Sequence, residues 1–506
     1  MVSRKETFRT RQKREMLDFD VDLTPSQFRS MARDTSEILL RFFADIKSRR
    51  VLPSKTSKEI QEVISESLPV RPQDPHRILS EVERKIIPNS TLNGSPRFFA
   101  FVNGSGTMMS VLADGIAAAL NQNAGAWNIG PVATELEELV IRWFSEMIGY
   151  DKRTGGLLTS GGTMANVTAL ATALHERARY DIINEGLQSE NRKGKFMLYM
   201  SDHEGHSSIV KAAQLLGLGR NSVKRVESNE DFTLNIRSLE ESVNRDANEG
   251  NIPFCVVGQV GSVNVGIVDP LREIADVCRR HNLWFHADGA CGAFGRIIPR
   301  KASLFDGLEL ADSVTLDPHK WLYISYECGC VLVKDPAKLK ASFTLVAPYL
   351  RGILPTETTG IDYFEYGPEG SRAFRALKVW MSLKQYGLVR YRKLFERNVA
   401  LAEYLDQLVR DSAEFEPLCK PVLQMYCFRF VANSGKRIDE EKLDGLNQRI
   451  VDEVQRSGKA FLMTTSIRGR TAIRLSITNH RTTKNDIRLT FEALQRTGVK
   501  LANASP

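Results

Sequence analysis

Four short runs of this 506-residue sequence combine residue types that could act together on a small molecule. The first, residues 159–163, reads Thr-Ser-Gly-Gly-Thr and follows the apolar pair Leu157 and Leu158. Adjacent glycines let the backbone approach a bound group closely, and the N-terminus of a helix offers free N–H donors at a positive dipole end. The run predicts either a phosphate-binding turn or a simple turn that caps the next helix.

A carboxylate and a lysine each come directly after an apolar run. Asp288 follows residues 283–285 within His-Ala-Asp-Gly-Ala, where it could keep a ring nitrogen protonated, cap a strand end or bind a metal. Lys320 follows residues 313–316 within Asp-Pro-His-Lys-Trp. Since burial lowers the pKa of an amine, we expect Lys320 to be a nucleophile toward an aldehyde rather than a surface lysine.

The fourth run holds two histidines three residues apart, His203 and His206, after the apolar residues 196–200. Gly205 lies between them and the spacing is not that of a zinc motif, so we expect no metal here. A planar imidazole can also stack on an aromatic ring. We therefore expect His206 either to stack on a bound ring or to be a structural histidine.

The elements that must position these runs alternate between strand and helix over about residues 90–395. Apolar runs predict strands, and helical periodicity predicts the segments between them. The predicted strands are 196–200, 254–260, 283–285, 313–316 and 330–333, and the predicted helices are 163–180, 207–216 and 270–281. This alternation predicts a mainly parallel sheet with helices on both faces, whose ligands bind at the carboxyl ends of the strands.

The two ends of the chain differ from this central part. Residues 1–90 combine a basic arm with a helical segment that opens at Thr24-Pro25-Ser26-Gln27, where a capping box is expected. From residue 396 the predicted order is helix, strand, helix and two strands. We therefore expect three parts, residues 1–90, a large domain over 91–395 and a small α+β domain over 396–506.

Charge and composition narrow the classes of protein. The net charge is +8, and residues 1–15 carry six Lys or Arg and two Glu, so this arm alone accounts for half of the excess. We expect a solvated arm, with a membrane-surface, nucleic-acid or targeting role as the alternative. No run approaches the roughly 18 apolar residues of a membrane span. The seven cysteines, an odd number, fit reduced thiols in a cytoplasmic protein.

Taken together, the four runs resemble the group II amino-acid decarboxylases that depend on pyridoxal 5′-phosphate (PLP), most closely the aromatic-L-amino-acid decarboxylases. The resemblance extends over about residues 90–395, and it rests mainly on Asp-Pro-His-Lys-Trp and on the His-Ala-Asp-Gly-Ala run before it. It implies PLP as cofactor and the α/β architecture of PLP fold type I, the aspartate-aminotransferase-like fold with a sheet of seven strands. It also implies a small-molecule substrate, namely an L-amino acid with an aromatic one favoured, and a homodimer with active sites at the interface.

The resemblance also implies a role for individual residues. Lys320 would hold the cofactor as a Schiff base, and His319 precedes it as the family's histidine does. The other cofactor-binding residues would be His206 stacked on the ring, Asp288 on the pyridine nitrogen, Ala290 and Ser262 near the cofactor, and Gly162 and Thr163 on the phosphate.

Tyr349 matches the tyrosine that donates a proton in aromatic-amino-acid decarboxylases, so the resemblance implies formation of the amine rather than the aldehyde. The implied substrate pocket contains Phe101, Asn103, Asn123 and Ser371. Asn103 and Asn123 stand where aromatic-specific enzymes carry bulkier residues, which leaves a decarboxylase of an acidic or diamino acid as the main alternative. An aldehyde-forming member of the family is a further alternative.

Overall fold

The structure, a computed structural model, describes residues 22–151, 153–345, 360–432 and 439–504. The chain divides into two compact units, of which the first ends at Leu92 and the second begins at Asn93. The described residues of the first unit contain three α-helices, α2 (Pro25–Asp45), α3 (Ser57–Ile64) and α4 (Pro75–Glu81). Helix α2 begins with the expected capping box, because Thr24 accepts from the Gln27 N–H while the Gln27 side chain accepts from the Thr24 N–H.

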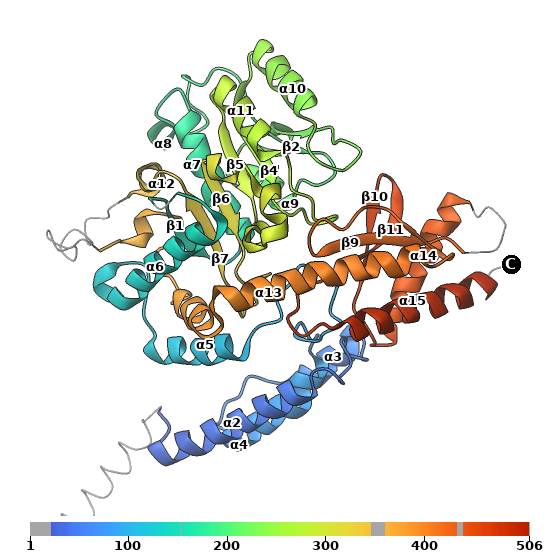
Figure 1. Ribbon diagram of the computed structural model, residues 1–506. Helices are drawn as coiled ribbons and strands as arrows, with labels where there is room; N and C mark the ends of the chain where they lie inside the picture. Colours follow the sequence, from blue (N-terminus) through green and yellow to red (C-terminus); the bar gives the residue numbers. More distant parts are fainter. Residues whose placement is uncertain (1–21, 152, 346–359, 433–438, 505–506) are drawn as a thin grey trace, which may run out of the picture. The chain divides into compact units, whose positions relative to one another are not determined.

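A seven-stranded sheet forms the centre of the second unit (Figure 1). Its strands are β1 (Gly155–Thr159), β2 (Phe196–Ser201), β3 (Val223–Val226), β4 (Ile252–Gln259), β5 (Trp284–Asp288), β6 (Ser313–Leu316) and β7 (Gly329–Val333). Their order across the sheet is β1-β7-β6-β5-β4-β2-β3. The pairs from β6 to β3 are parallel, whereas β7 is antiparallel to both of its neighbours. The predicted fold class, a mainly parallel α/β sheet, is confirmed.

Helices cover both faces of this sheet. The helices of the second unit are α5 (Met108–Leu120), α6 (Pro131–Ile148), α7 (Gly162–Arg177), α8 (Ile182–Glu185), α9 (Ser207–Leu215), α10 (Ile236–Asn248), α11 (Leu271–His281), α12 (Pro336–Phe343), α13 (Ala376–Arg410), α14 (Glu440–Arg456) and α15 (Lys484–Ala504). Helices α7 and α9 connect strands in one direction across the sheet, and α10 and α11 connect them in the other. Right-handed crossovers then place these two pairs on opposite faces.

A second, antiparallel sheet lies in the C-terminal part of the same unit, in the order β10-β11-β9-β8. Its strands are β8 (Phe415–Pro417), β9 (Met425–Phe430), β10 (Met463–Ile467) and β11 (Arg470–Ser476). This sheet, α14 and α15 enclose a separate apolar core. Helix α13 continues through residue 395, where the boundary between the large domain and the small C-terminal domain was expected. This domain boundary stays a prediction.

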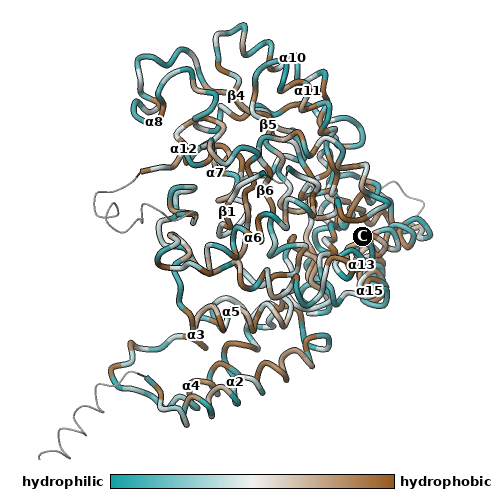
Figure 2. Tube along the Cα trace, turned by 60° about the vertical axis from the view of Figure 1, so that its left-hand side comes forward, coloured by the Kyte–Doolittle hydropathy of each residue, from teal (hydrophilic) through white to brown (hydrophobic). Residues whose placement is uncertain are grey.

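Apolar residues concentrate in the central strands, and polar residues lie on the outer loops around α8 and α10 (Figure 2).

All seven cysteines carry free thiols. Among the helices in the described part of the chain, none is both long and apolar enough to cross a membrane.

A buried ion pair fixes the end of β1. The Arg372 guanidinium contacts the Glu137 carboxylate, and both side chains are almost completely inaccessible. Arg372 also donates to the carbonyls of Ala124 (2.9 Å) and Leu158 (2.6 Å), and Glu137 accepts from the Leu158 N–H (2.8 Å). This network holds the strand that leads into the Gly161-Gly162 turn.

Substituting Arg372→Met should lower the free energy of unfolding by about 3–5 kcal/mol, because the Glu137 carboxylate would remain buried without a cation. Urea denaturation followed by tryptophan fluorescence measures the change. Arg142→Met is the matched control, since its pair with Glu138 is exposed and should contribute less than about 1 kcal/mol. Equal losses in the two variants would contradict a special role for the buried pair.

Candidate active site

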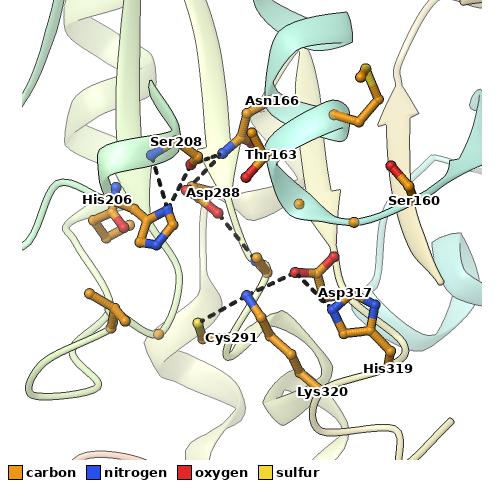
Figure 3. A pocket seen from close by; sticks show the side chains of 17 residues that line it. Ser160, Thr163, Asn166, His206, Ser208, Asp288, Cys291, Asp317, His319 and Lys320 are labelled. Atoms are coloured by element: carbon orange, nitrogen blue, oxygen red, sulfur yellow. Dashed lines mark hydrogen bonds and ion pairs between the residues drawn. The ribbon is translucent and has the colours of Figure 1, made fainter. Parts of the chain in front are cut away.

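A cavity of about 310 Å³ lies where β4, β5 and β6 end and α7 begins (Figure 3). The sequence predicted that the polar residues following these strands would meet, and the structure brings most of them together. The predicted residues that line the cavity are Gly162, Thr163, His206, Asp288, Ala290, His319 and Lys320.

Lys320 extends into this cavity from the turn that follows β6. Its Nζ lies 2.8 Å from Asp317 Oδ2 and 3.7 Å from Cys291 Sγ. The turn is closed by the Lys320 N–H, which donates to the Asp317 carbonyl (2.9 Å). The lysine side chain is therefore mostly enclosed, with 17% of it exposed, and a carboxylate three residues earlier accompanies it.

This carboxylate changes the expected charge of the lysine. Burial lowers the pKa of Lys320, but the attractions of Asp317, Cys291 and Asp288 together outweigh burial and raise the pKa above its usual value. The predicted lowering of this pKa is therefore wrong for the protein without cofactor. Lys320 is an ammonium group here, and it must lose a proton before it can attack an aldehyde.

Asp288 ends β5 and is held by two hydrogen bonds. Its Oδ2 accepts from Asn166 Nδ2 (3.1 Å), and its Oδ1 accepts from the Ala290 N–H (3.3 Å). Asn166 lies on α7, and its Oδ1 accepts in turn from Thr315 Oγ1 (2.5 Å). The carboxylate is thus fixed in orientation and faces the cavity.

Asn166 is also linked to His206 by hydrogen bonds through the Ser208 side chain. Asn166 Nδ2 donates to Ser208 Oγ (2.8 Å), which lies 2.7 Å from His206 Nδ1. Nδ1 also accepts from the Ser208 N–H (3.2 Å), so the neutral ring carries its proton on Nε2. Burial lowers the pKa of His206, which favours this neutral form.

His319 is also held neutral. Its Nδ1 accepts from the Cys328 N–H (3.1 Å), and burial lowers its pKa to about 3. The ring stacks on Tyr326 with centroids 4.4 Å apart, and Tyr326 donates to Asn103 Oδ1 (2.6 Å). Gly104 follows Asn103 and contacts the backbone of the lysine turn so closely that an added Cβ would lie 2.3 Å from the His319 carbonyl.

The remaining predicted residues in the described part of the chain do not line the cavity. Ser262 lies behind its wall, where its hydroxyl accepts from the Ile267 N–H (3.2 Å). Phe101 and Ser371 are exposed, and Asn123 Oδ1 accepts two backbone N–H bonds. Tyr349 lies outside the described residues. The substrate roles of these residues stay predictions.

The cavity residues that were missed from the sequence include Asn166, Asp317, Cys291 and Gln259. Asp317 belongs to the lysine motif and could have been found there. Gln259 ends β4 just as Asp288 ends β5, and this strand-end position was a usable indication. Asn166 and Cys291 sit within a helix and a turn, where the sequence offers no comparable mark.

This fold, with a lysine and a carboxylate at neighbouring strand ends, is suited to an enzyme that uses an aldehyde cofactor. Residues 57–431 match the family described as pyridoxal-dependent decarboxylase conserved domain. The chain is 31% identical over 468 residues to the aromatic-L-amino-acid decarboxylase of Bacillus atrophaeus, covering 92% of this chain and 95% of that protein. Tyrosine decarboxylase 4 of Petroselinum crispum is 30% identical over 483 residues, or 94% and 93% of the two chains.

Solved structures agree with this assignment. The crystal structure of Oryza sativa TDC with PLP and tryptamine matches with a TM-score of 0.87 at 26% identity, covering 96% of this chain and 99% of that one. The chain belongs to the pyridoxal-dependent decarboxylase family. It is a PLP-dependent amino-acid decarboxylase, and the predicted family, cofactor and enzyme class are confirmed.

The cavity fits this cofactor chemically. Lys320 supplies the amine, and Asp288 supplies a carboxylate suited to a protonated ring nitrogen. The turn before α7 presents backbone rather than side chains, and a Cβ at Gly162 would lie only 2.7 Å from Asp317 Oδ2. Gln259 Nε2 is a buried donor without a partner among the described residues, so it is available to an oxygen of a ligand.

Substituting Asn166→Ala should weaken PLP binding roughly 5- to 100-fold, since it removes a buried donor from Asp288, a loss of about 1–3 kcal/mol. Titration of the apoprotein with PLP, followed by visible absorbance, gives the Kd. Thr168→Val on the same helix is the control, because the Thr168 hydroxyl donates only to the Met164 carbonyl. An unchanged Kd in Asn166→Ala would show that Asp288 needs no such support.

Proposed function

We propose that this protein decarboxylates aromatic L-amino acids, namely tyrosine, DOPA, tryptophan or phenylalanine, to the amine and carbon dioxide. The observation that carries the proposal is the convergence of Lys320, Asp288 and His206 on one cavity at the strand ends. The aromatic preference is supported by the two relatives described above, whose names specify aromatic substrates.

Each of these residues has a definite task in this proposal. PLP, when bound, supplies a ring that accepts the electron pair left behind as the carboxylate departs. Asp288 keeps the ring nitrogen protonated, and Asn166 and the Ala290 N–H hold its carboxylate in place. His206 stacks its neutral imidazole on the ring, and Lys320 holds the cofactor through its amine.

The turn at Gly162 and Thr163 binds the phosphate, with the positive end of the α7 dipole behind it. His319 supports the lysine turn through its bond from Cys328. Tyr349 returns a proton to the former α-carbon, which gives the amine. Without such a donor the aldehyde-forming reaction becomes the alternative.

The case for a diamino acid is weakened by the hydrogen bonds of two asparagines. Asn103 Oδ1 already accepts from Tyr326, and Asn123 Oδ1 accepts from the N–H groups of Gly125 and Arg372. Asn123 Oδ1 thus has both of its lone pairs engaged, and Asn103 Oδ1 has one of its two engaged, which reduces what they offer to a second amino group of a substrate. This supports the aromatic assignment over a diamino acid.

Purified holoenzyme should release amine and carbon dioxide in equal amounts from an aromatic amino acid, with little aldehyde or peroxide. Lys320→Ala should abolish turnover, because no other amine lines the cavity in the described chain. Lys334→Ala is the control, since Lys334 donates to the Glu309 carbonyl instead. The panel contains Trp, Tyr, Phe, DOPA, Glu and 2,4-diaminobutyrate, and turnover of the last two alone would overturn the aromatic assignment.

We further propose that two copies of the chain form a homodimer with the active sites at the interface. Helix α5 exposes an apolar stripe with a spacing of four residues, formed by Met108, Leu112, Ile116 and Leu120. Among the described residues, one chain contributes histidines to the cavity wall but no Phe, Tyr or Trp side chain. A second copy that covers this stripe would give the aromatic substrate a fuller apolar pocket.

The free thiols support a cytoplasmic location.

The double substitution Leu112→Arg with Ile116→Arg should convert the dimer to a monomer, because two charges would be buried at the interface. Sedimentation velocity at micromolar concentration measures the mass. Leu215→Arg is the matched control, since Leu215 is an exposed leucine on α9, outside this stripe. A wild-type monomer, or a double variant that still dimerises, would refute the role of this stripe.

A further inference from the structure

Two cysteines of the C-terminal sheet, Cys419 and Cys427, lie beside one another. Cys427 is completely buried on β9, whereas Cys419 follows β8 and is partly exposed. Strands β8 and β9 are paired, and the pairing continues to the Leu418 N–H, which donates to the Cys427 carbonyl (3.1 Å). The Cys419 thiol donates to the same carbonyl (3.7 Å). The two cysteines therefore occupy adjacent places at the edge of this sheet.

The two thiols also interact directly. Burial raises the pKa of the Cys427 thiol, and a side-chain hydrogen bond with Cys419 raises it further. Strand β8 ends at Pro417, so the Cys419 side chain is not bound to the strict alternation of a strand. Both cysteines pack in one small apolar cluster. Two thiols in hydrogen-bond contact need only a short further approach to form an S–S bond.

Cys419 is the thiol of this pair that a solute can reach. It lines a surface cavity of about 510 Å³, together with the cations Arg410 and Lys420 and the acids Glu230 and Asp231. All seven cysteines lie in the described part of the chain, and the six others are buried. An oxidant would therefore meet Cys419 first and would find a second thiol directly behind it.

The buried member of the pair is connected to the active-site cavity. Cys427 Sγ donates to the Asn264 carbonyl (3.3 Å), and the preceding residue, Val263, lines the active-site cavity. Asn264 Nδ2 in turn donates to the His203 carbonyl (3.4 Å), in the loop that leads to His206. The position of β9 is thus coupled to the cavity wall and to the loop that carries the predicted ring-stacking histidine.

We propose that Cys419 and Cys427 are a redox pair, which a hydroperoxide converts to a disulfide that weakens PLP binding reversibly. The disulfide removes the S–H group that donates to the Asn264 carbonyl, so one of the bonds that hold the cavity wall is lost. In a reducing compartment such a bond is transient, as a regulatory disulfide must be.

The oxidation balances in atoms and electrons. The Cys419 sulfur attacks one oxygen of hydrogen peroxide, the O–O bond breaks, and a sulfenic acid and one water are formed. The Cys427 sulfur then displaces the hydroxyl group of this sulfenic acid, which leaves as a second water with the Cys427 thiol proton. Two thiols are oxidised by two electrons, and one peroxide is reduced to two waters. Exchange with a small thiol restores both cysteines.

Peptide mapping of peroxide-treated holoenzyme, after alkylation of the remaining thiols, tests the formation of the bond. We expect one pair of peptides linked through Cys419 and Cys427. Titration of the oxidised protein with PLP, followed by visible absorbance, should give a Kd about 2- to 10-fold higher than that of the reduced protein, because one hydrogen bond to the wall is lost. Dithiothreitol should restore the original Kd.

Cys419→Ser should bind PLP as the reduced wild type does and should not respond to peroxide, since Cys427 keeps its bond to Asn264 but has no partner to form a disulfide. Cys278→Ser is the matched control, because Cys278 is a buried thiol on α11, and this variant should respond as the wild type does.

Three results would overturn the proposal. Absence of the linked peptides from the wild type would refute the pair itself. Linked peptides with an unchanged Kd would refute its coupling to the cavity. A peroxide effect on the Kd that persists in Cys419→Ser would assign the effect to another thiol, such as Cys291 in the cavity wall. Because PLP binding is measured directly, each result is independent of which amino acid the enzyme decarboxylates.

Discussion

Charge compensation inside a buried cavity is the constraint on which the rest of this site depends. An ammonium group and two carboxylates lie at neighbouring strand ends, where little water can solvate them. Lys320 is compensated by Asp317 through a direct ion pair, whereas Asp288 is compensated by hydrogen bonds from Asn166 and Ala290. The parallel strands β5 and β6 impose this proximity, because their carboxyl ends lie at the same edge of the sheet.

The histidines add no further charge to this arrangement. His286 lies behind Asp288, and burial lowers its pKa to about 4, so it is neutral at physiological pH. It donates from Nε2 to Asn166 Oδ1 (3.0 Å), and its Nδ1 lies 2.8 Å from Ser313 Oγ. Trp284 donates to the same serine oxygen (2.8 Å). The network continues from the apolar core to the cavity without an ionised member, so it can orient Asp288 without changing the net charge around it.

Much of the fold and the polar half of the site could be predicted from the sequence, because apolar runs mark buried strands and the residues that follow them meet at one edge. The antiparallel direction of β7 could not, since it depends on a short return from β6 rather than on composition. The charge of Lys320 was mispredicted because burial is visible as apolar neighbours, whereas the ion pair requires the turn that brings Asp317 back to Nζ. Ser262 shows the same limit, because the turn it occupies decides which way its hydroxyl points.

The residues predicted to bind the substrate are positioned differently from the residues that line the cavity. Lys320, Asp288 and Gly162 are fixed by strand ends and a helix start, which tolerate little change in backbone position. Phe101, Asn123 and Ser371 lie in irregular segments, where sequence can vary without disturbing the sheet. One such segment is nevertheless anchored, because Gly104 contacts the backbone of the lysine turn. Substitutions near residue 103 are therefore expected to change the surroundings of Lys320 through their side chains. The backbone there is held in place by its contact with the turn that carries Lys320.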